Sequence, residues 1–368
     1  MLNQKQIILG ISAFYHDSAA AIIIGDEIIA AAEEERLTRE KHTAEFPIYA
    51  IEFCLKKADV RLDQVDEIVY YDKPFLKFER ILEIVYQNVP FGFRLFHKAI
   101  PAWIKTKLNL RKTIQKELKQ LVPDYKIPRD KLKFSSHHLS HAASAFFPSP
   151  FDEAAILIID DVGELATVSI GKGIGNKIEL IEQINFPHSL GMLYSAFTEY
   201  LGFRVNYGEY KLMGLSPYGK WESTETKMYY TKIKNQLIRV WEDGSFELNL
   251  DYFQFNRKEK MARNSKWEAL FGLKLRSKNV AFRQSHANLA LAIQKVTEEI
   301  VLGLAKRAVE KTGCQNLVMA GGVALNGVAN GILIQEKFIK DVWVQPAASD
   351  AGGALGAAMV GCFCFIFY

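Results

Sequence analysis

The stretch IILGISAFYHDSAAAIIIGDEIIAAAEEE, residues 7–35, decides how the chain begins to fold. Two apolar runs, 7–11 and 19–24, flank a polar His-Asp-Ser bend. A Gly-Asp pair typical of a tight hairpin turn then leads into a third apolar run at 28–32. The pattern predicts three consecutive strands with polar side chains at their first bend.

A similar pattern returns at residues 154–184. Apolar runs 154–159 and 166–170 flank an acidic bend, Asp160–Glu164, and a glycine-bearing turn and a third apolar run follow. Two such units half a chain apart predict duplicated halves, each presenting a polar bend to a shared cleft. Three-strand meanders are common in proteins, so coincidence is the alternative.

The composition is that of a globular protein. The 368 residues are enough for two domains, with 49% hydrophobic and 24% charged residues. The net charge of +4 is too small to indicate nucleic-acid binding. Four scattered cysteines and an N-terminus without a signal-peptide pattern favour a reducing, cytoplasmic location. The uncharged run 351–368 reaches the lower length limit of a membrane span, but its glycines and alanines argue against one.

Between the two strand units, residues 73–131 differ from the rest of the chain. They carry 14 Lys or Arg residues against 5 Asp or Glu residues, with helical periodicity and interleaved aromatic residues. The segment is either a solvated helical insertion with a small core of its own, or a basic face for an anionic acceptor, lipid head groups or a partner. The sequence leaves both open.

Residues 285–312 form the clearest predicted helix. Ser285 is its candidate N-cap and Gly313 its stop. A short apolar strand, the pair Gly321-Gly322 and a small-residue helix follow. This order brings backbone N–H groups close to a phosphate, so we expect a nucleotide there.

The segment SHHLSHAA, residues 136–143, predicts a metal site. Its His137 and His141 are four residues apart, so in a helix both rings lie on one face, within reach of one ion. Two buried histidines that only hydrogen-bond are the alternative. Because two imidazoles leave a first-row metal short of ligands, we expect acidic partners. Asp160 and Asp350 are the candidates, with a helix N-cap as the alternative for Asp350.

Three glycine-bearing polar bends are suited to hold a nucleotide: Asp161–Glu164, Gly214–Gly219 and Gly321–Asn326. None matches GxxxxGK[ST] or GxGxxG, so P-loop and Rossmann sites are excluded. Together with the repeated hairpins, the bends resemble the two-lobed ATPase clefts of actin, Hsp70 and sugar kinases. This resemblance implies an α/β fold with duplicated lobes of mixed β-sheet flanked by helices.

Five sequence blocks, in chain order, carry a closer resemblance: HDSAA (16–20), EEERLTREKH (33–42), HHLSHAASAFFPSPF (137–151), GEYKLMGLSPYG (208–219), and GGVALN (321–326) with SDAGGALGAA (349–358). From residue 7 to 359 the chain closely resembles the nodulation-protein-U and cephamycin-type O-carbamoyltransferases. The same core is similar to the catalytic subunit of the tRNA threonylcarbamoyl transferase and to the hydrogenase maturation carbamoyltransferase.

The resemblance implies carbamoyl transfer from carbamoyl-adenylate, made from carbamoyl phosphate and ATP, to a hydroxyl group of a sugar or other secondary metabolite. It places His16 near that hydroxyl, where an imidazole suits a general base, and Lys41 beside it. The alternatives are a turn-capping role for His16 and a surface position for Lys211. The implied ligands of a divalent metal, iron first, are His137, His141, Asp160 and Asp350. The expected nucleotide contacts are Gly163, Glu164, Lys211, Gly214, Gly321, Gly322 and Asn326.

Two features depart from the family. Relatives read Asp-Gly-Val-Gly-Glu-Trp at the second bend, where this chain has Asp161 and Leu165, and the extra carboxylate is expected to weaken ATP binding or demand more metal. Relatives also continue into a YrdC-like domain that forms carbamoyl-adenylate. Residues 360–368 do not resemble the family, and we expect them to be a truncation tail. We therefore expect a first lobe over 1–150, a second over 151–359, and a YrdC-like partner.

Two other functions compete with carbamoyl transfer: an inactive remnant that binds nucleotide and metal, and a sugar kinase of the same superfamily. The HxxxH pair argues against the kinase, because such kinases bind magnesium through carboxylates rather than imidazoles. The sequence does not indicate the acceptor, the native metal or the oligomeric state.

Overall fold

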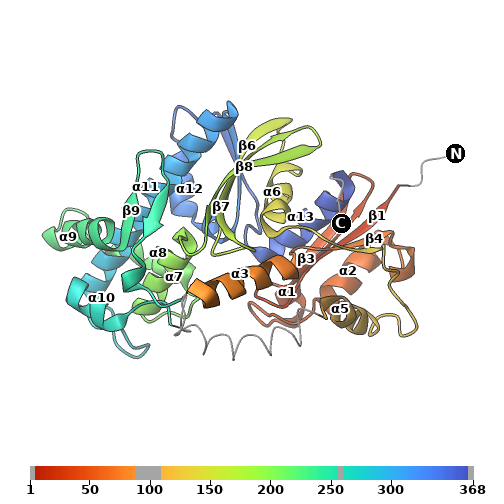
Figure 1. The fold of residues 1–368 in the computed structure, drawn as a ribbon, viewed down its shortest axis with the longest axis horizontal. Helices are drawn as coiled ribbons and strands as arrows, with labels where there is room; N and C mark the ends of the chain where they lie inside the picture. Colours follow the sequence, from red (N-terminus) through yellow and green to blue (C-terminus); the bar gives the residue numbers. More distant parts are fainter. Residues whose placement is uncertain (1–4, 88–108, 256–259, 364–368) are drawn as a thin grey trace.

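The computed structural model of the chain describes residues 5–87, 109–255 and 260–363. Within them, two five-stranded mixed sheets lie next to each other with helices around them (Figure 1). The first has the strand order β3-β2-β1-β4-β5, and the second has the equivalent order β8-β7-β6-β11-β12. In each sheet the three strands that come first in the chain pair antiparallel to one another. The two later strands run parallel to the earliest one, β1 in the first sheet and β6 in the second. The predicted α/β fold with two duplicated mixed sheets is confirmed.

The first three strands of each sheet follow one another directly, and the later, parallel strands are connected through helices, as parallel connections require. The strands of the two sheets are β1 (Ile7–Ser12), β2 (Ala19–Ile24), β3 (Glu27–Glu33), β4 (Glu67–Tyr70), β5 (Leu132–Phe134), β6 (Glu153–Ile159), β7 (Ala166–Ile174), β8 (Lys177–Asn185), β11 (Asn316–Ala320) and β12 (Asp341–Val344), and a small separate hairpin is formed by β9 (Ile238–Val240) and β10 (Phe246–Leu248).

Most of the described helices lie on or beside the two sheets. They are α1 (Glu34–Thr38), α2 (Ile48–Ala58), α3 (Pro74–Gln87), α5 (Leu110–Leu118), α6 (His137–Phe146), α7 (Leu190–Tyr200), α8 (Glu209–Leu215), α9 (Thr224–Lys232), α10 (Asn264–Phe271), α11 (Gln284–Thr312), α12 (Gly327–Leu333) and α13 (Asp350–Phe363), with single turns η1 (Leu62–Gln64), η2 (Ser216–Tyr218), η3 (Ile233–Leu237), η4 (Leu250–Tyr252) and η5 (Gly322–Leu325).

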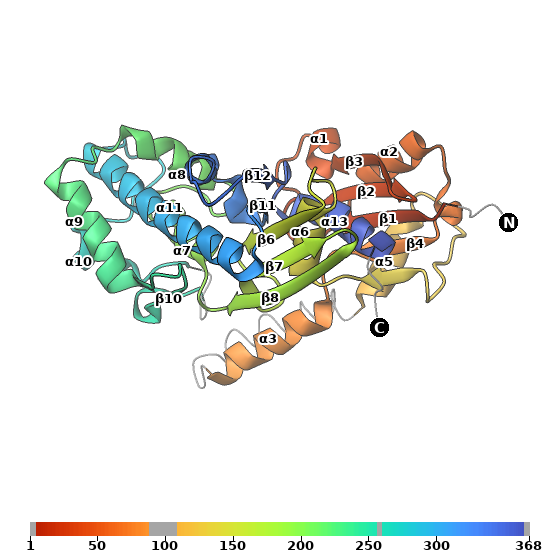
Figure 2. The same ribbon diagram turned by 90° about the horizontal axis from the view of Figure 1, so that it is seen from above.

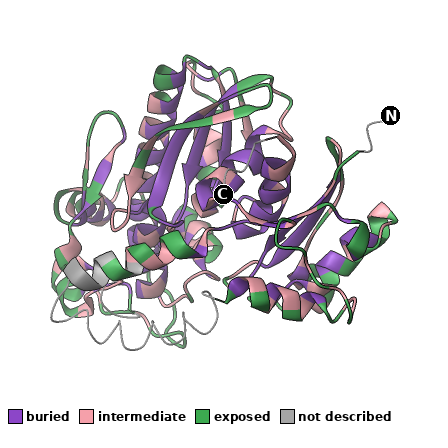
Figure 3. Cartoon of the chain, turned by 45° about the vertical axis from the view of Figure 1, so that its right-hand side comes forward, coloured by how far each residue is buried: buried purple, intermediate pink, exposed green. Residues whose placement is uncertain are grey.

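Burial follows the apolar runs of the sequence. Strands β1, β2 and β6 are buried almost throughout, whereas β8 is largely exposed, so the second sheet has one solvated edge (Figure 3). Gly25 makes the predicted β2–β3 turn with a φ of 66°, a conformation that glycine adopts without strain. The two sheets therefore follow from the two apolar meanders, and their polar bends remain at the sheet ends.

Helix α13 joins the two halves of the chain. It follows the last strand of the second sheet, yet it packs against β1, β2 and β4 of the first, and it lies beside α6 (Figure 2). The approach is close enough to require glycine: a Cβ on Gly356 would lie 1.7 Å from the Ser140 carbonyl oxygen. Residues of α13 thus complete the core of the first sheet, and the boundary expected at residue 150 stays a prediction.

The basic segment contributes two described helices. Helix α5 buries Leu110, Ile114 and Leu118 in the core of the first sheet. Helix α3 instead extends toward the second lobe (Figures 1 and 2). Residues 88–108 of this segment, with half of its aromatic residues, lie outside the described residues, and so do residues 364–368 of the expected tail.

Three other sequence predictions concern helix ends and membrane insertion. The long helix α11 begins at Gln284 with Arg283 as its N-cap, so the prediction of Ser285 as N-cap is wrong. Its predicted stop at Gly313 is confirmed, with a φ of 70°. Among the described helices, none combines the length and the hydropathy needed to cross a membrane.

Candidate functional site

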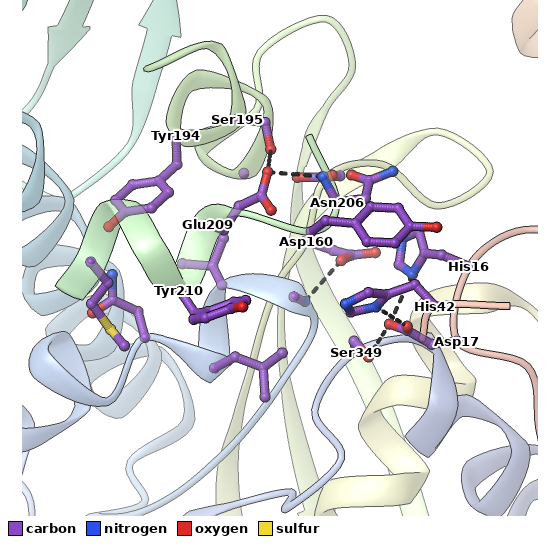
Figure 4. Close-up of a pocket in the computed structure, with 18 of the residues that line it drawn as sticks. His16, Asp17, His42, Asp160, Tyr194, Ser195, Asn206, Glu209, Tyr210 and Ser349 are labelled. Atoms are coloured by element: carbon purple, nitrogen blue, oxygen red, sulfur yellow. Dashed lines mark hydrogen bonds and ion pairs between the residues drawn. The ribbon is translucent and has the colours of Figure 1, made fainter. Parts of the chain in front are cut away.

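The polar bends of the two sheets meet at a pocket of about 160 Å³ (Figure 4). The β1–β2 bend reaches it from the first lobe and the β6–β7 bend from the second, because β1 and β6 hold equivalent places in their sheets. The lining residues are His16, Asp17, His42, Asp160, Asp161, Gly191, Tyr194, Ser195, Asn206, Tyr207, Glu209, Tyr210, Met213, Thr297, Gly322, Val323, Leu325, Asn326 and Ser349.

The four predicted metal ligands converge beside this pocket. One ligand atom from each of His137, His141, Asp160 and Asp350 lies within 4.8 Å of the other three, and all four residues are buried. The two Nε2 atoms are 3.2 Å apart. His137 Nε2 lies 3.0 Å from Asp160 Oδ2 and 3.4 Å from Asp350 Oδ1. The grouping predicted from the i, i+4 spacing and the two acids is therefore present.

Three of the four predicted ligands lie at the end of a regular element, and His141 lies one turn into α6. His137 is the first residue of α6, Asp160 follows the last residue of β6, and Asp350 is the first residue of α13. Asp160 Oδ1 accepts a hydrogen bond from the Gly322 backbone N–H at 2.9 Å. Asp350 Oδ2 accepts one from the Tyr71 hydroxyl at 3.1 Å. These contacts leave the other carboxylate oxygens directed at the histidine pair.

The electrostatics of the cluster suit a cation. Burial by itself would lower the pKa of His141, but hydrogen bonds to Asp160 and Asp350 raise it to about 9. Burial would raise the pKa of Asp160, but hydrogen bonds from His137 and His141 hold it well below its usual range. Two imidazoles and two carboxylates are a ligand set that first-row divalent metals accept, so the residues fit the implied metal. A divalent cation would displace the protons that now balance the carboxylates.

Gly163 and Glu164 support this cluster and do not line the pocket. Glu164 Oε1 accepts a hydrogen bond from the His137 backbone N–H at 2.8 Å. A side chain of the second bend therefore provides a partner for an N–H group that has none within α6. A Cβ on Gly163 would lie 2.9 Å from His138 Cδ2 and 3.0 Å from His137 Cδ2. Their predicted contact with nucleotide stays a prediction.

His138 points away from the cluster, as its helical position predicts. Its Nδ1 is 2.7 Å from Ser169 Oγ on β7. Burial, followed by the neighbouring His137, lowers its pKa to about 3, so the ring is neutral. His138 therefore fastens α6 to the second sheet and is not a ligand.

The first bend brings three polar side chains together. His16 Nδ1 donates to Asp17 Oδ2 at 2.9 Å, and His42 Nδ1 donates to Asp17 Oδ1 at 2.6 Å. Burial alone would lower the pKa of His16, but the hydrogen bond to Asp17 and the charges of Asp350, Asp17 and Asp161 raise it to about 9. A ring with this pKa carries its proton at neutral pH and can donate it, and the role of His16 as a general base stays a prediction.

The second bend adds a second aspartate to the pocket. Asp161 lines the pocket beside Asp160 and packs against Gly191. Burial, then the charges of Asp160 and Glu209, raise its pKa to about 7. Glu209 is held by Ser195 Oγ at 2.9 Å and by the Asn206 backbone N–H at 3.1 Å. This wall of the pocket is therefore acidic.

The opposite end of the pocket has a more apolar lining. In Figure 4, Tyr194 and Tyr210 lie toward one side, away from His16 and Asp17. Met213, Val323 and Leu325 add further apolar surface. A pocket with one polar and one apolar end suits an amphipathic ligand such as a nucleotide.

The Gly-Gly turn adjoins both ends. Gly321 has a φ of 90°, and its Cβ would lie 2.3 Å from the Ile159 carbonyl oxygen, so this position requires glycine. Asn326 lines the pocket, and its Oδ1 caps α12 by accepting from the Ala329 N–H at 3.1 Å. Of the predicted nucleotide contacts, Gly322 and Asn326 thus line the pocket directly.

Three residues predicted to belong to the site lie apart from the pocket. Lys41, Lys211 and Gly214 are exposed and do not line the pocket. A Cβ on Gly214 would meet nothing within 4 Å, so no close backbone approach requires a glycine there. Lys211 is 5.6 Å from the ring centre of Tyr210, which does line the pocket. The roles of these three residues stay predictions.

Sequence reasoning missed several pocket residues. Asp17 and His42 directly follow the predicted His16 and Lys41, so the signal lay within the quoted blocks. Ser349 directly precedes Asp350, and its Oγ donates to Asp17 Oδ2 at 2.7 Å. Glu209 lies in the quoted block 208–219, where only Lys211 and Gly214 were singled out, and Tyr207 just before that block carried no signal.

Helix α3 of the basic segment also reaches this region. The Lys77 ammonium pairs with the buried Asp72 carboxylate and lies over the rings of Tyr15 and Tyr71. Arg80 donates from its guanidinium to the Gly163 carbonyl oxygen. The helix thus ties the second bend to the first lobe, and the basic segment is in part a structural support of the site.

Comparisons with known proteins agree with the motifs. The family described as carbamoyltransferase N-terminus matches residues 7–359. An uncharacterized protein of Synechocystis sp. is 50% identical over 352 residues, which are 96% of this chain and 56% of that protein. Nodulation protein NolNO of Sinorhizobium fredii is 34% identical over 352 residues, covering 95% of this chain and 46% of that protein.

Among solved structures, HypF of T. kodakarensis is similar at 12% identity and a TM-score of 0.46, covering 98% of this chain and 48% of that one. The chain spans about half the length of the curated relatives it matches. The chain belongs to the carbamoyltransferase N-terminus family.

Proposed function

We propose that the chain is the transferring part of an O-carbamoyltransferase, which moves a carbamoyl group from carbamoyl-adenylate to a hydroxyl group of a sugar or another secondary metabolite. One observation carries the proposal: the His16 bend and the buried His137 cluster adjoin one pocket with an apolar far end. Family membership supplies the reaction class. The activity of a whole enzyme also needs the donor, which we assign to a YrdC-like protein acting on carbamoyl phosphate and ATP.

The proposed step balances as an acyl transfer. The acceptor oxygen forms a bond to the carbamoyl carbon, and the bond from that carbon to the phosphate oxygen breaks. AMP leaves with the electron pair, and the hydroxyl proton goes to a base in the pocket. Negative charge grows on the carbonyl oxygen and then on the leaving phosphate, so the step needs positive charge nearby.

Residues of both lobes supply that charge in the proposal. A divalent metal, iron first, held by His137, His141, Asp160 and Asp350, would give Lewis-acid stabilisation of the phosphate charge. The His16 imidazolium lies close enough to feel the charges of Asp350 and Asp161, so its N–H can donate to the carbonyl or phosphate oxygen. The apolar surfaces of Tyr210 and Met213 suit the adenosine.

A second candidate is a nucleotide- and metal-binding protein without turnover. The observation that favours it is Asp161, because a buried carboxylate beside Asp160 repels the phosphates of a nucleotide. Because the pKa of Asp161 is about 7, its carboxyl group can bind a proton, and in that neutral form it does not repel the phosphates.

Isotope-labelled carbamoyl phosphate separates the two candidates. The chain, loaded with Fe²⁺ without oxygen, is mixed with ATP, a YrdC-like protein and a panel of sugars and aminoglycosides, and labelled products are detected by mass spectrometry. Label on a hydroxyl group that requires the chain, and is lost in His137→Ala/His141→Ala, supports transfer. Stoichiometric metal and ATP binding without any labelled product from the whole panel supports the binding protein.

A further inference from the structure

The segment after α1 holds His42 in an unusual backbone conformation. His42 has a φ of 54° and Asp17 a φ of 58°, in the left-handed region that few residues other than glycine adopt. The His42 backbone N–H donates to Glu35 Oε2 at 2.8 Å, which fixes the turn. Such conformations persist where the surrounding structure determines them, and they gather at functional sites.

The Asp17 carboxylate is the centre of this group. One oxygen accepts from His42 Nδ1, and the other accepts from His16 Nδ1 and Ser349 Oγ. All four side chains line the pocket, and Figure 4 shows them grouped at one side of it. Because both rings bond Asp17 through Nδ1, both keep Nε2 for a ligand.

The side chains around Asp17 connect the two lobes, and the two imidazole rings among them face different neighbours. Ser349 adjoins the metal ligand Asp350, and the His42 ring lies edge-on to Tyr207 of the second lobe, with centres 4.5 Å apart. His16 faces the charges of Asp350 and Asp161, the metal side of the pocket. The charges that face His42 are Asp17, Glu35 and His16.

We propose that His42 is a second imidazole of the reacting centre, which accepts the proton of the acceptor hydroxyl at Nε2, and that Asp17 is a positioning residue for both rings. The inference rests on the proposed function and supplies the base that it lacks. The hydrogen bond to Asp17 and the charges of Asp17 and Glu35 raise the pKa of His42, so its neutral form is a stronger base than a free imidazole. His42 then takes the proton while the acceptor oxygen bonds the carbamoyl carbon and AMP leaves with the electron pair.

The placement of the rings is tested without any turnover. Histidine ring signals are titrated by NMR in the wild type, in Asp17→Asn and in Glu40→Gln, a control that removes an exposed carboxylate in the same segment. Asparagine keeps the size of Asp17 and tolerates positive φ, so the fold is retained. The charged groups that face His16 are Asp17, Asp161 and Asp350, and Lys77 lies over the neighbouring Tyr15 ring. The charged groups that face His42 are Asp17, Glu35 and His16, and Arg204 lies over the ring of Tyr207, which His42 contacts.

The expected result is that both rings titrate at lower pH in Asp17→Asn, His16 by more than one pH unit, while Glu40→Gln leaves both in place. Unchanged titration of either ring in Asp17→Asn overturns the positioning role. His42→Asn, which also tolerates positive φ, identifies the signal of His42.

The catalytic role is tested by the labelled transfer assay. We expect His42→Asn to lower kcat about 100-fold, with ATP affinity within twofold of wild type and with loss of the acidic limb of the pH–rate profile. Asp17→Asn should move that limb to lower pH. A His42→Asn variant with the wild-type rate and profile overturns the role of His42.

A wild type that transfers no label to any acceptor rejects the proposed function and the base role together, whereas the NMR titration still decides the placement by Asp17.

Discussion

The two sheets share one strand order, but their first bends differ in chemistry. The β1–β2 bend carries His16 and Asp17 and gathers a second imidazole from the turn after α1. The β6–β7 bend carries two aspartates and a glutamate and gathers imidazoles from α6. The duplicated topology therefore places two bends at one pocket, and the side chains make one suited to proton transfer and the other to a cation.

The difference also appears in how the bends are built. The first bend needs left-handed backbone at Phe14 and Asp17, so its geometry is held by non-glycine residues in a rare conformation. The second bend has no positive φ between Asp160 and Leu165, and its tightness comes from Gly163, which packs against two histidine rings. Conformation fixes one bend, and packing fixes the other.

The largest effect is expected from removing the imidazoles of the cation side. His137→Ala/His141→Ala leaves two buried carboxylates without positive partners and removes half of the ligand set, so affinity for a divalent metal should fall at least about 100-fold. Metal content after anaerobic purification, measured by mass spectrometry, checks this. A metal-free wild type would reject the site, and His188→Asn, outside the cluster, serves as a control for histidine loss.

Gly163→Ala tests whether packing fixes the second bend. The added Cβ would meet buried histidine rings at about 3 Å, so we expect a loss of about 1–3 kcal/mol in the free energy of unfolding and weaker metal binding. Gly214→Ala is the matched control for stability, since its Cβ meets nothing and lies in a helix. Equal unfolding midpoints in urea for the two variants would contradict the packing argument.

Much of this arrangement could be predicted from the sequence. The apolar runs predicted both meanders, and the i, i+4 spacing predicted that His137 pairs with His141, because those signals are local in the chain. Asp160 and Asp350 are more distant in sequence, and the expected need for acidic ligands singled them out. Lys41 marked the right turn but the adjacent residue, His42, is the one that lines the pocket. Spacing alone could not select between neighbours in a turn with positive φ.

Other features depend on tertiary packing that no local pattern encodes. Glu164 was expected at a nucleotide, but it accepts the first N–H of α6, and this requires knowing that the second bend lies against that helix. Helix α13 belongs by sequence to the second half, but it is buried against the first sheet. Lys77 and Arg80 similarly reach the site only because α3 extends across to the second lobe.

The first bend predicts a pH-dependent stability. The pKa of His16 is about 9 in the fold against 6.5 in the unfolded chain, so its pair with Asp17 stabilises fully below pH 6.5, and the gain is lost as the pH rises toward 9. The pKa of Asp17 is lowered, so the gain is also lost on acidification through its unfolded value of about 4. The pair should therefore stabilise most between about pH 4 and 6.5.

Asp17→Asn checks this window. We expect it to lower the free energy of unfolding by about 2 kcal/mol at pH 5.5 and by much less at pH 9.5, measured by urea unfolding at both values. Glu40→Gln should show no such difference. A constant loss at both pH values would mean that Asp17 acts by packing and not by charge.

The smallest expected effect concerns Asp161, the second aspartate of the β6–β7 bend. Asp161→Asn keeps the contact with Gly191 but removes a charge beside Asp160 and Glu209. Since nucleotide phosphates are anionic, we expect ATP to bind about 5–10-fold more tightly, on the order of 1 kcal/mol, by calorimetry. Metal content should stay unchanged, because Asp161 is not in the ligand cluster. Weaker ATP binding with lost metal would instead mean that Asp161 is itself a ligand, and the second bend would then hold the cation through two adjacent acids.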